Sequence, residues 1–302
     1  MTQDTPRPQA SDFPREVLGL FDRYVHGDID RRGFIDGASK FTVGGVTAAA
    51  MLEALSPRFA QAQQVSPGDA RIKVESVDFA SPQGYGSGRA YVARPAQAAA
   101  PLPVVLVIHE NRGLNPHIED IARRLALDNF IAFAPDALQP LGGYPGDEDK
   151  ARERFAALDQ AKTREDFVAA ARVARALPGG NGRLGAVGFC WGGGMVNTLA
   201  ERVPELAAGV PFYGPAPALD KVADIKAALQ IFFAGNDDRI NAGWPAYEAA
   251  LKAAGVRFEA FKYPGTEHGF NNDTTPRYDA AAARQAWERT VAFYNRTLRT
   301  AG

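Results

Sequence analysis

The only cysteine of the chain, Cys190, lies in the segment LGAVGFCWGGGM, where a short apolar run ends. A sharp turn from a strand into a helix can expose a nucleophile only if small residues stand two positions before and after it, because the strained backbone leaves no room for Cβ atoms there. Gly188 and Gly192 occupy these positions. A lone cysteine is more often a small buried apolar residue. The glycines nevertheless predict a nucleophile elbow, with a thiolate as the attacking group.

Such a nucleophile needs a general base, and an acid to orient that base, on loops further along the chain. The buried-strand run LQIFFAG ends at Gly235 and is followed by Asp237 and Asp238. The run VRFEAFKYPG is followed by His268. An imidazole that titrates near neutrality can take the thiol proton and return it to a leaving group. Either aspartate could accept from the other ring nitrogen, and the residues alone leave both open.

Strands and helices that could position these loops alternate along most of the chain. Residues 71–79 and 88–94 are predicted to form two edge strands around the glycine-rich turn GYGSG. Buried-strand runs and helical patterns then follow one another to a final helix from about residue 277. Alternation of this kind predicts an α/β fold, with a mostly parallel, doubly wound sheet and helices on both faces.

The first 65 residues form a separate segment, followed by a predicted catalytic domain over 66–302. The pair Arg31 and Arg32 precedes the apolar run FTVGGVTAAAMLEAL and then RFAQA, an order similar to a twin-arginine export signal with cleavage after Ala62. That interpretation predicts a periplasmic protein. The alternative is a helical extension over roughly residues 13–56 in a cytoplasmic protein, packed against the catalytic domain or against a second subunit in a homodimer.

Composition excludes several classes of partner. A net charge of −1 gives no electrostatic footprint for nucleic acid or an anionic membrane. No run has the 18 or so apolar residues of a membrane-spanning helix, and one cysteine cannot form an internal disulfide. His109 and His117 flank Glu110, but no later partner completes a metal site. The prediction is therefore an enzyme without metal or cofactor that acts on a small molecule.

Four segments together resemble the dienelactone hydrolase (carboxymethylenebutenolidase) family over roughly residues 70–300: GFCWGG, AGNDDRI, GTEHGF and VVLVIHENRGLN. The resemblance implies an α/β-hydrolase fold in which Cys190 is the nucleophile and His268 the base. The family's acid stands in a D-x-x-[VI] pattern. Asp237 fits that pattern through Ile240, so the resemblance favours it over Asp238.

The resemblance also assigns groups around the thiol. It places a glutamate after the third strand in contact with the resting thiol, and Glu110 matches it. A carboxylate there disfavours the thiolate and would protect the resting enzyme. In this fold the oxyanion hole is formed by the amide after the nucleophile, here Trp191, and by one from the loop after the third strand, here Asn111.

One position departs from the family pattern. An arginine that binds the substrate carboxylate stands four residues after the catalytic histidine, where this chain has Asn272. Arg112 or Arg239 could supply the cation, and Tyr144 and Tyr213 are candidate pocket walls. The sequence thus predicts a hydrolase of small esters or lactones that forms a thioester intermediate. Acyl transfer on the same triad and a non-catalytic ligand-binding protein are the alternatives.

Overall fold

The computed structural model of the chain describes residues 8–42 and 46–299. They contain an eight-stranded sheet with the strand order β1-β2-β4-β3-β5-β6-β7-β8. β2 is antiparallel to β1 and β4, and the other neighbours are parallel. The strands are β1 (Ile72–Ser81), β2 (Gly86–Pro95), β3 (Leu102–Ile108), β4 (Ile131–Pro135), β5 (Gly180–Phe189), β6 (Leu206–Phe212), β7 (Ala228–Ala234) and β8 (Phe258–Tyr263).

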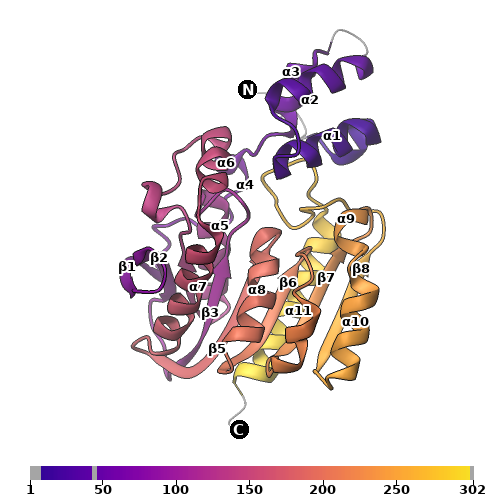
Figure 1. Cartoon of the computed structure of the whole chain (residues 1–302). Helices are drawn as coiled ribbons and strands as arrows, with labels where there is room; N and C mark the ends of the chain where they lie inside the picture. Colours follow the sequence, from indigo (N-terminus) through magenta and orange to yellow (C-terminus); the bar gives the residue numbers. More distant parts are fainter. Residues whose placement is uncertain (1–7, 43–45, 300–302) are drawn as a thin grey trace.

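Helices cover both faces of this sheet (Figure 1). The α-helices are α1 (Arg15–His26), α2 (Arg31–Ala38), α3 (Ala48–Leu55), α4 (Phe59–Ala62), α5 (Pro116–Leu127), α6 (Glu148–Ala156), α7 (Gln160–Arg175), α8 (Trp191–Arg202), α9 (Asp238–Asn241), α10 (Trp244–Ala253) and α11 (Ala280–Leu298). Short 3-10 turns are η1 (Ala10–Asp12), η2 (Ser39–Phe41), η3 (Gln139–Leu141) and η4 (Leu219–Asp224). No described helix is long and apolar enough to cross a membrane.

The core divides into two layers because successive side chains of a strand point to opposite faces. In β3, Val104, Leu106 and Ile108 pack with residues of α7, α8 and α10. Val105 and Val107 pack on the other face with residues of α5 and α11. Burial on both sides explains why the parallel strands are nearly continuous apolar runs.

The predicted fold class is confirmed, and one detail of it is wrong. Only β1 is an edge strand on that side, because β2 continues the sheet by pairing with β4, through Ala90–Pro135 and Ala93–Ala132. The prediction treated residues 88–94 as an edge because a hairpin read from sequence does not reveal which of its strands faces the rest of the sheet.

The N-terminal helices form a small group above the carboxyl ends of the parallel strands (Figure 1). Their apolar core combines residues of α1, α2 and α3, among them Phe21, Phe34 and Leu52. Arg31 and Arg32 are the first residues of α2, and the Asp30 carboxylate caps this helix at Gly33 N. Within the apolar run of the twin-arginine interpretation, residues 43–45 lie outside the described residues. The segment contacts the loops that follow β3 and β8, and both the domain division and export stay predictions.

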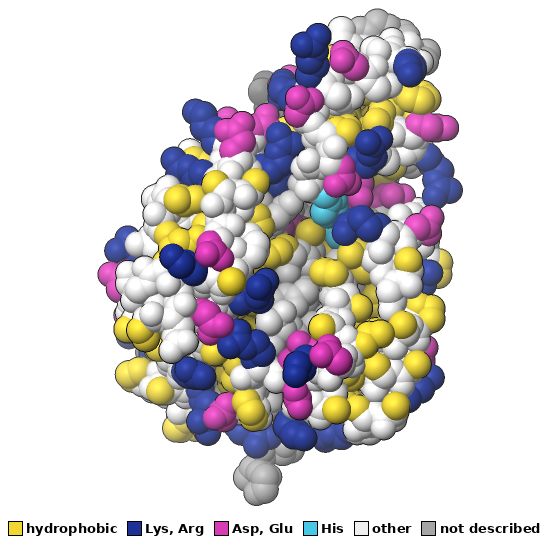
Figure 2. All heavy atoms as spheres, viewed as in Figure 1, with side chains coloured by type: hydrophobic (Ala, Val, Ile, Leu, Met, Phe, Trp, Pro, Cys, Tyr) yellow, Lys and Arg dark blue, Asp and Glu magenta, His cyan; other side chains and the backbone are white. Residues whose placement is uncertain are grey.

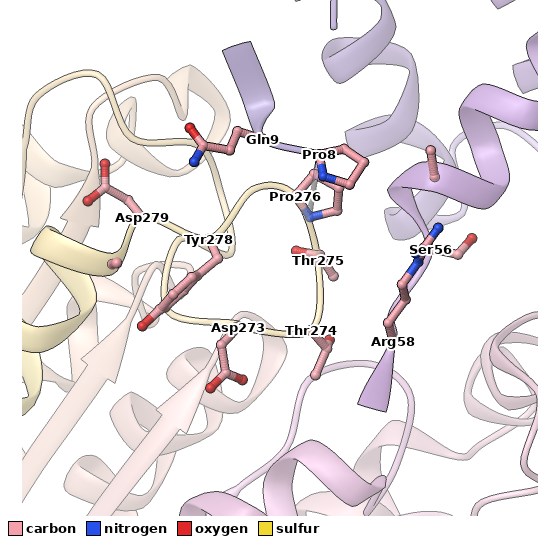
Figure 3. Close-up of a pocket in the computed structure, with 12 residues that line it drawn as sticks. Pro8, Gln9, Ser56, Arg58, Asp273, Thr274, Thr275, Pro276, Tyr278 and Asp279 are labelled. Carbon is pink, nitrogen blue, oxygen red and sulfur yellow. The ribbon is translucent and has the colours of Figure 1, made fainter. Parts of the chain in front are cut away.

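The loop between β8 and α11 carries part of this contact. Arg58 N donates to Thr274 O over 2.8 Å. A cavity of about 410 Å³ lies beside this contact, lined by N-terminal residues such as Gln9 and Ser56 and by the loop through Tyr278 (Figure 3). Its lining contains no residue of the predicted triad. The cavity therefore marks where the N-terminal segment meets the loop that follows His268.

Candidate active site

Cys190 stands at the turn between β5, which ends at Phe189, and α8, which begins at Trp191. Its backbone has φ 55° and ψ −116°, a strained conformation for a residue with a side chain. A Cβ on Gly188 would lie 2.1 Å from Gly192 O, and one on Gly192 would lie 2.4 Å from Ile108 O. Both glycines are therefore required by close backbone contacts, as the elbow pattern in the sequence indicates.

Gly192→Ala is expected to lower both stability and activity. The added methyl group meets the rigid backbone of β3, so the start of α8 must move, at a cost of about 1–3 kcal/mol in unfolding free energy. Thermal denaturation and ester turnover measure the two effects. Gly68→Ala is the control, because its Cβ would meet only Ser66 Oγ at 3.8 Å. Equal stability of both variants would show that the elbow tolerates a side chain there.

His268 and Asp237 meet on the loops that follow β8 and β7. His268 Nδ1 lies 2.5 Å from Asp237 Oδ2, and both side chains are buried. Asp237 Oδ1 also accepts from Ile240 N over 3.3 Å, which fixes the carboxylate at the start of α9. Asp238, the alternative acid, is exposed. The structure thus pairs the histidine with Asp237.

The sulfur of Cys190 lies close to this pair. Ligand atoms of Cys190, His268 and one further histidine, His26, all lie within 4.8 Å of one another. Among the residues that the structure describes, His268 Nε2 is buried and has no hydrogen-bond partner. Burial lowers the pKa of His268, but the charge of Cys190 and the hydrogen bond to Asp237 outweigh it and raise this pKa to about 9. His268 therefore holds a proton at neutral pH.

The thiol is correspondingly acidic. Burial raises the pKa of Cys190, but the charge of His268 and the hydrogen bond with His26 outweigh it and lower this pKa to about 6. A thiolate that forms near neutral pH is the reactive form of cysteine. The site can therefore supply a nucleophile together with a proton donor.

The sequence analysis missed His26, the last residue of α1. Its Nε2 lies 3.5 Å from Cys190 Sγ, and its ring meets the His268 ring edge-on at 4.8 Å between centroids. The sequence offers one signal for His26, namely that it is one of only four histidines in the chain. The N-terminal segment thus reaches the candidate active site.

Cysteine and two histidines are also the donor set of soft metal sites. Here Arg239 Nη2 lies 2.8 Å from His26 Nε2, so a guanidinium cation faces the lone pair that a metal would need. This arrangement does not favour binding of a metal cation beside Arg239.

The sequence analysis also considered a metal site formed by His109, Glu110 and His117. In the structure His109 Nε2 accepts from Ala137 N over 3.1 Å, and His117 Nδ1 lies 3.2 Å from Asp273 Oδ1, so both imidazoles have protein partners.

The two predicted oxyanion donors are backbone amides beside the elbow. Within residues 8–42 and 46–299, neither Trp191 N nor Asn111 N has a hydrogen-bond acceptor. Both residues line the cavity at Cys190. The Asn111 side chain is occupied, because its Nδ2 donates to Val25 O of α1 over 2.9 Å.

Glu110 has a different partner from the one that the resemblance implies. Glu110 Oε2 accepts from Asn272 Nδ2 over 3.0 Å. Asn272 is the position at which the family pattern has an arginine, so in this chain the residue at that position donates to Glu110. The thiol lies 3.5 Å from His26 Nε2 and interacts with both His26 and His268.

A cavity of about 420 Å³ opens at Cys190 below the N-terminal helices, where Figure 2 shows histidine atoms beside Lys or Arg atoms. Its walls are largely apolar and include Phe155, Trp191, Tyr213, Pro215 and Ile240. Two arginines, Arg152 and Arg239, also line it. Tyr213, with φ 37°, places its ring 5.0 Å from the His268 ring. The cavity suits a small molecule with an apolar body.

The other two predicted substrate contacts are engaged elsewhere. Arg112 is buried, donates to Val25 O over 3.1 Å and lies 3.6 Å from Glu148. Tyr144 OH donates to Glu148 Oε1 over 2.8 Å. Neither side chain belongs to the described lining of the cavity at Cys190. Both side chains hold the helices beside the site in place.

A parallel sheet with a strained nucleophile turn, and with acid and histidine loops after later strands, defines an α/β-hydrolase. Residues 89–298 match the Dienelactone hydrolase family, and the chain belongs to this family. Residues 5–43 match a second family, described as YqhI-like.

Individual relatives agree with this assignment. The "Putative carboxymethylenebutenolidase" of Escherichia coli K12 is 34% identical over 220 residues, which cover 68% of this chain and 81% of the relative. The "Putative hydrolase fragment YghX" of the same strain is 49% identical over 108 residues, covering 36% of this chain and 92% of the fragment. A crystal structure titled as a putative dienelactone hydrolase from Klebsiella pneumoniae has a TM-score of 0.65 at 29% identity, and covers 74% of this chain and 98% of that one.

Proposed function

We propose that this protein hydrolyses small carboxylic esters or lactones through a thioester on Cys190. Asp237 orients His268, and the amides of Trp191 and Asn111 bind the oxyanion. His268 gives a proton to the leaving group and later activates the water that cleaves the thioester. The chemistry of these groups requires no metal or cofactor.

The observation that carries this proposal is the placement of the buried His268–Asp237 pair beside an activated thiol at a strained elbow. His268 Nδ1 is held by Asp237 at 2.5 Å, which leaves the buried Nε2 as the ring nitrogen that can exchange a proton. A buried polar nitrogen without a partner is costly in a purely structural role. In a catalytic role it is the atom that exchanges the proton with the reacting oxygen.

The family assignment supports a hydrolase of this class, and the cavity supports the size of its substrate. Each unpaired backbone amide that meets the oxyanion typically contributes about 3–4 kcal/mol to the stabilisation of the transition state. Acyl transfer would use the same groups with an alcohol or thiol in place of water. Product analysis with and without added alcohols distinguishes the two reactions.

A second expectation concerns Arg239. Among the described residues it has no carboxylate partner, and it lines the cavity, whereas Arg152 donates to Tyr24 O and lies 3.5 Å from Asp149. Arg239 is therefore the cation available to a substrate carboxylate. Arg239→Ala is expected to lower kcat/KM about 10- to 100-fold for an ester that carries a free carboxylate.

A panel of lactones and short-chain esters on the wild-type enzyme tests both statements. It includes a half-ester with a free carboxylate and its uncharged methyl ester. The uncharged ester is the internal control, and Arg239→Ala should lower its turnover less than that of the half-ester, because only the half-ester loses an ion pair. An equal loss for both esters would contradict a role in carboxylate binding, and no turnover across the panel would contradict the proposed function.

A further inference from the structure

α1 brings a second imidazole to the nucleophile. His26 Nε2 lies 3.5 Å from Cys190 Sγ, a hydrogen-bond distance for sulfur, whereas His268 Nε2 has no partner among the described residues. In this structure the thiol thus lies within hydrogen-bond distance of an imidazole from the N-terminal segment, in addition to lying beside His268. A contact of this kind to the reacting atom requires an explanation in the chemistry.

The ring of His26 is held in a single orientation. Its Nδ1 lies 2.7 Å from Asp22 O, and because a carbonyl only accepts, Nδ1 carries a hydrogen. Arg239 Nη2, which only donates, lies 2.8 Å from Nε2. Nε2 is therefore the ring nitrogen that can take the thiol proton, and the pKa values of about 6 for Cys190 and about 10 for His26 describe the pair after that transfer.

Main-chain contacts fix the position of α1 on the catalytic domain. Val25 O accepts from Asn111 Nδ2 over 2.9 Å and from Arg112 Nη2 over 3.1 Å. Tyr24 O accepts from Arg152 Nη1 over 2.8 Å. These bonds give donors to two carbonyls of the last turn of α1, where a helix leaves its own carbonyls without partners. They place His26 above the elbow with little freedom to move.

We propose that His26 is a catalytic residue, supplied by the N-terminal segment, that accepts the proton of the Cys190 thiol. The proposal rests on the proposed hydrolase function and divides its proton transfers between two imidazoles. His26 accepts the proton of the thiol. His268 donates a proton to the leaving group and later accepts one from the attacking water.

The proton balance closes without a further reactant. A proton moves from Sγ to His26 Nε2, the sulfur lone pair forms the S–C bond, and the C–O bond to the leaving group breaks. The leaving oxygen takes a proton from His268 Nε2. Neutral His268 then accepts a proton from the water that attacks the thioester carbonyl, the C–S bond breaks, and the sulfur recovers its proton from His26.

The charges around the pair support this direction of transfer. Burial lowers the pKa of His26, but hydrogen bonds with Asp22 and Cys190 outweigh it and raise this pKa to about 10. Burial would also raise the pKa of Asp22, yet its bond with His26 and nearby positive charges hold it well below its usual range. Arg239 is exposed, so solvent screens its charge at Nε2. The titratable and charged groups that face His26 are Asp22, Cys190, His268 and Arg239, and Arg277 lies 3.6 Å from Asp22.

Alkylation of Cys190 by iodoacetamide across pH tests the proposal in the full chain, and the single cysteine makes the signal specific. The pH at half-maximal rate reports the thiol pKa irrespective of how open the cavity is. We expect a wild-type midpoint near 6 and a rise of about one unit or more in both His26→Ala and His26→Gln. Arg23→Ala, an exposed change on the same helix, should retain the wild-type midpoint.

Ester turnover gives the second readout. His26→Ala should lose about 100-fold in kcat/KM, as expected for removal of a general base, and added imidazole should restore part of it. A wild-type midpoint in His26→Gln would overturn the proposal, because glutamine fills the space without accepting a proton. The alkylation profile needs no substrate, so absence of ester hydrolysis by the wild type would refute the proposed function and leave this readout intact.

Discussion

Cys190→Ala is expected to lower kcat for small esters by about 10⁵- to 10⁶-fold, the loss typical of removing a triad nucleophile. The variant keeps the oxyanion amides, the His268–Asp237 pair and the cavity, so substrate binding should persist. Alanine tolerates the backbone at this position no worse than cysteine, because both carry a Cβ. Steady-state kinetics, with thermal denaturation as the check on folding, measures the result.

The intermediate gives this prediction a second measurement. Wild-type enzyme stopped early with an activated ester should gain the mass of one acyl group, and its only cysteine should resist alkylation until the thioester hydrolyses. Cys190→Ala should gain no mass. Cys190→Ser is the conservative control, because it places a hydroxyl nucleophile beside the same imidazole. Turnover by Cys190→Ala within tenfold of wild type would refute the proposed nucleophile.

Local constraints explain why the elbow could be predicted from the sequence. Gly188 and Gly192 are required by backbone atoms that lie within 2.5 Å of where their Cβ atoms would stand, and this requirement is visible as two glycines at fixed spacing. The buried parallel strands are visible as apolar runs for a similar reason, since both of their faces lack water. Such constraints act within a few residues of chain and therefore leave a readable pattern.

The placement of His26 could not be read in this way. It depends on Val25 O accepting hydrogen bonds from Asn111 and Arg112, across more than 80 residues of chain, and a backbone carbonyl leaves no mark in the sequence. The same contact explains Arg112, which is an equally good candidate for a substrate carboxylate until its partners are known. An arginine offers five donors to any acceptor, so its type alone does not identify the one that it meets.

The choice between neighbouring aspartates shows the same limit on a smaller scale. The residues alone left Asp237 and Asp238 open, and the family pattern favoured Asp237. In the structure Asp237 lies 2.5 Å from His268 Nδ1, whereas Asp238 is exposed at the start of α9. Neighbouring residues of the turn after β7 thus point their carboxylates in different directions. Which of the two reaches His268 depends on the three-dimensional path of the turn, which the sequence alone does not show.

Asp237→Asn is therefore expected to lower kcat by about 10⁴-fold with little change in fold. The amide can donate to Nδ1, which favours the hydrogen on Nε2 in neutral His268 and removes the base needed for the water step. Without the carboxylate, the pKa of His268 should also fall from about 9, so the enzyme should lose its proton donor at lower pH than the wild type.

Asp238→Asn is the matched control, since it makes the same chemical change one residue away on an exposed side chain. Its kcat should remain within a factor of about two of wild type, because surface substitutions of this kind rarely exceed ±0.5 kcal/mol. The pH profile of kcat separates orientation from stability: Asp237→Asn should move its alkaline limb to lower pH, and a merely destabilised enzyme would lose amplitude at every pH. A profile unchanged in shape for Asp237→Asn, or a larger loss in Asp238→Asn, would assign the orienting role to another carboxylate.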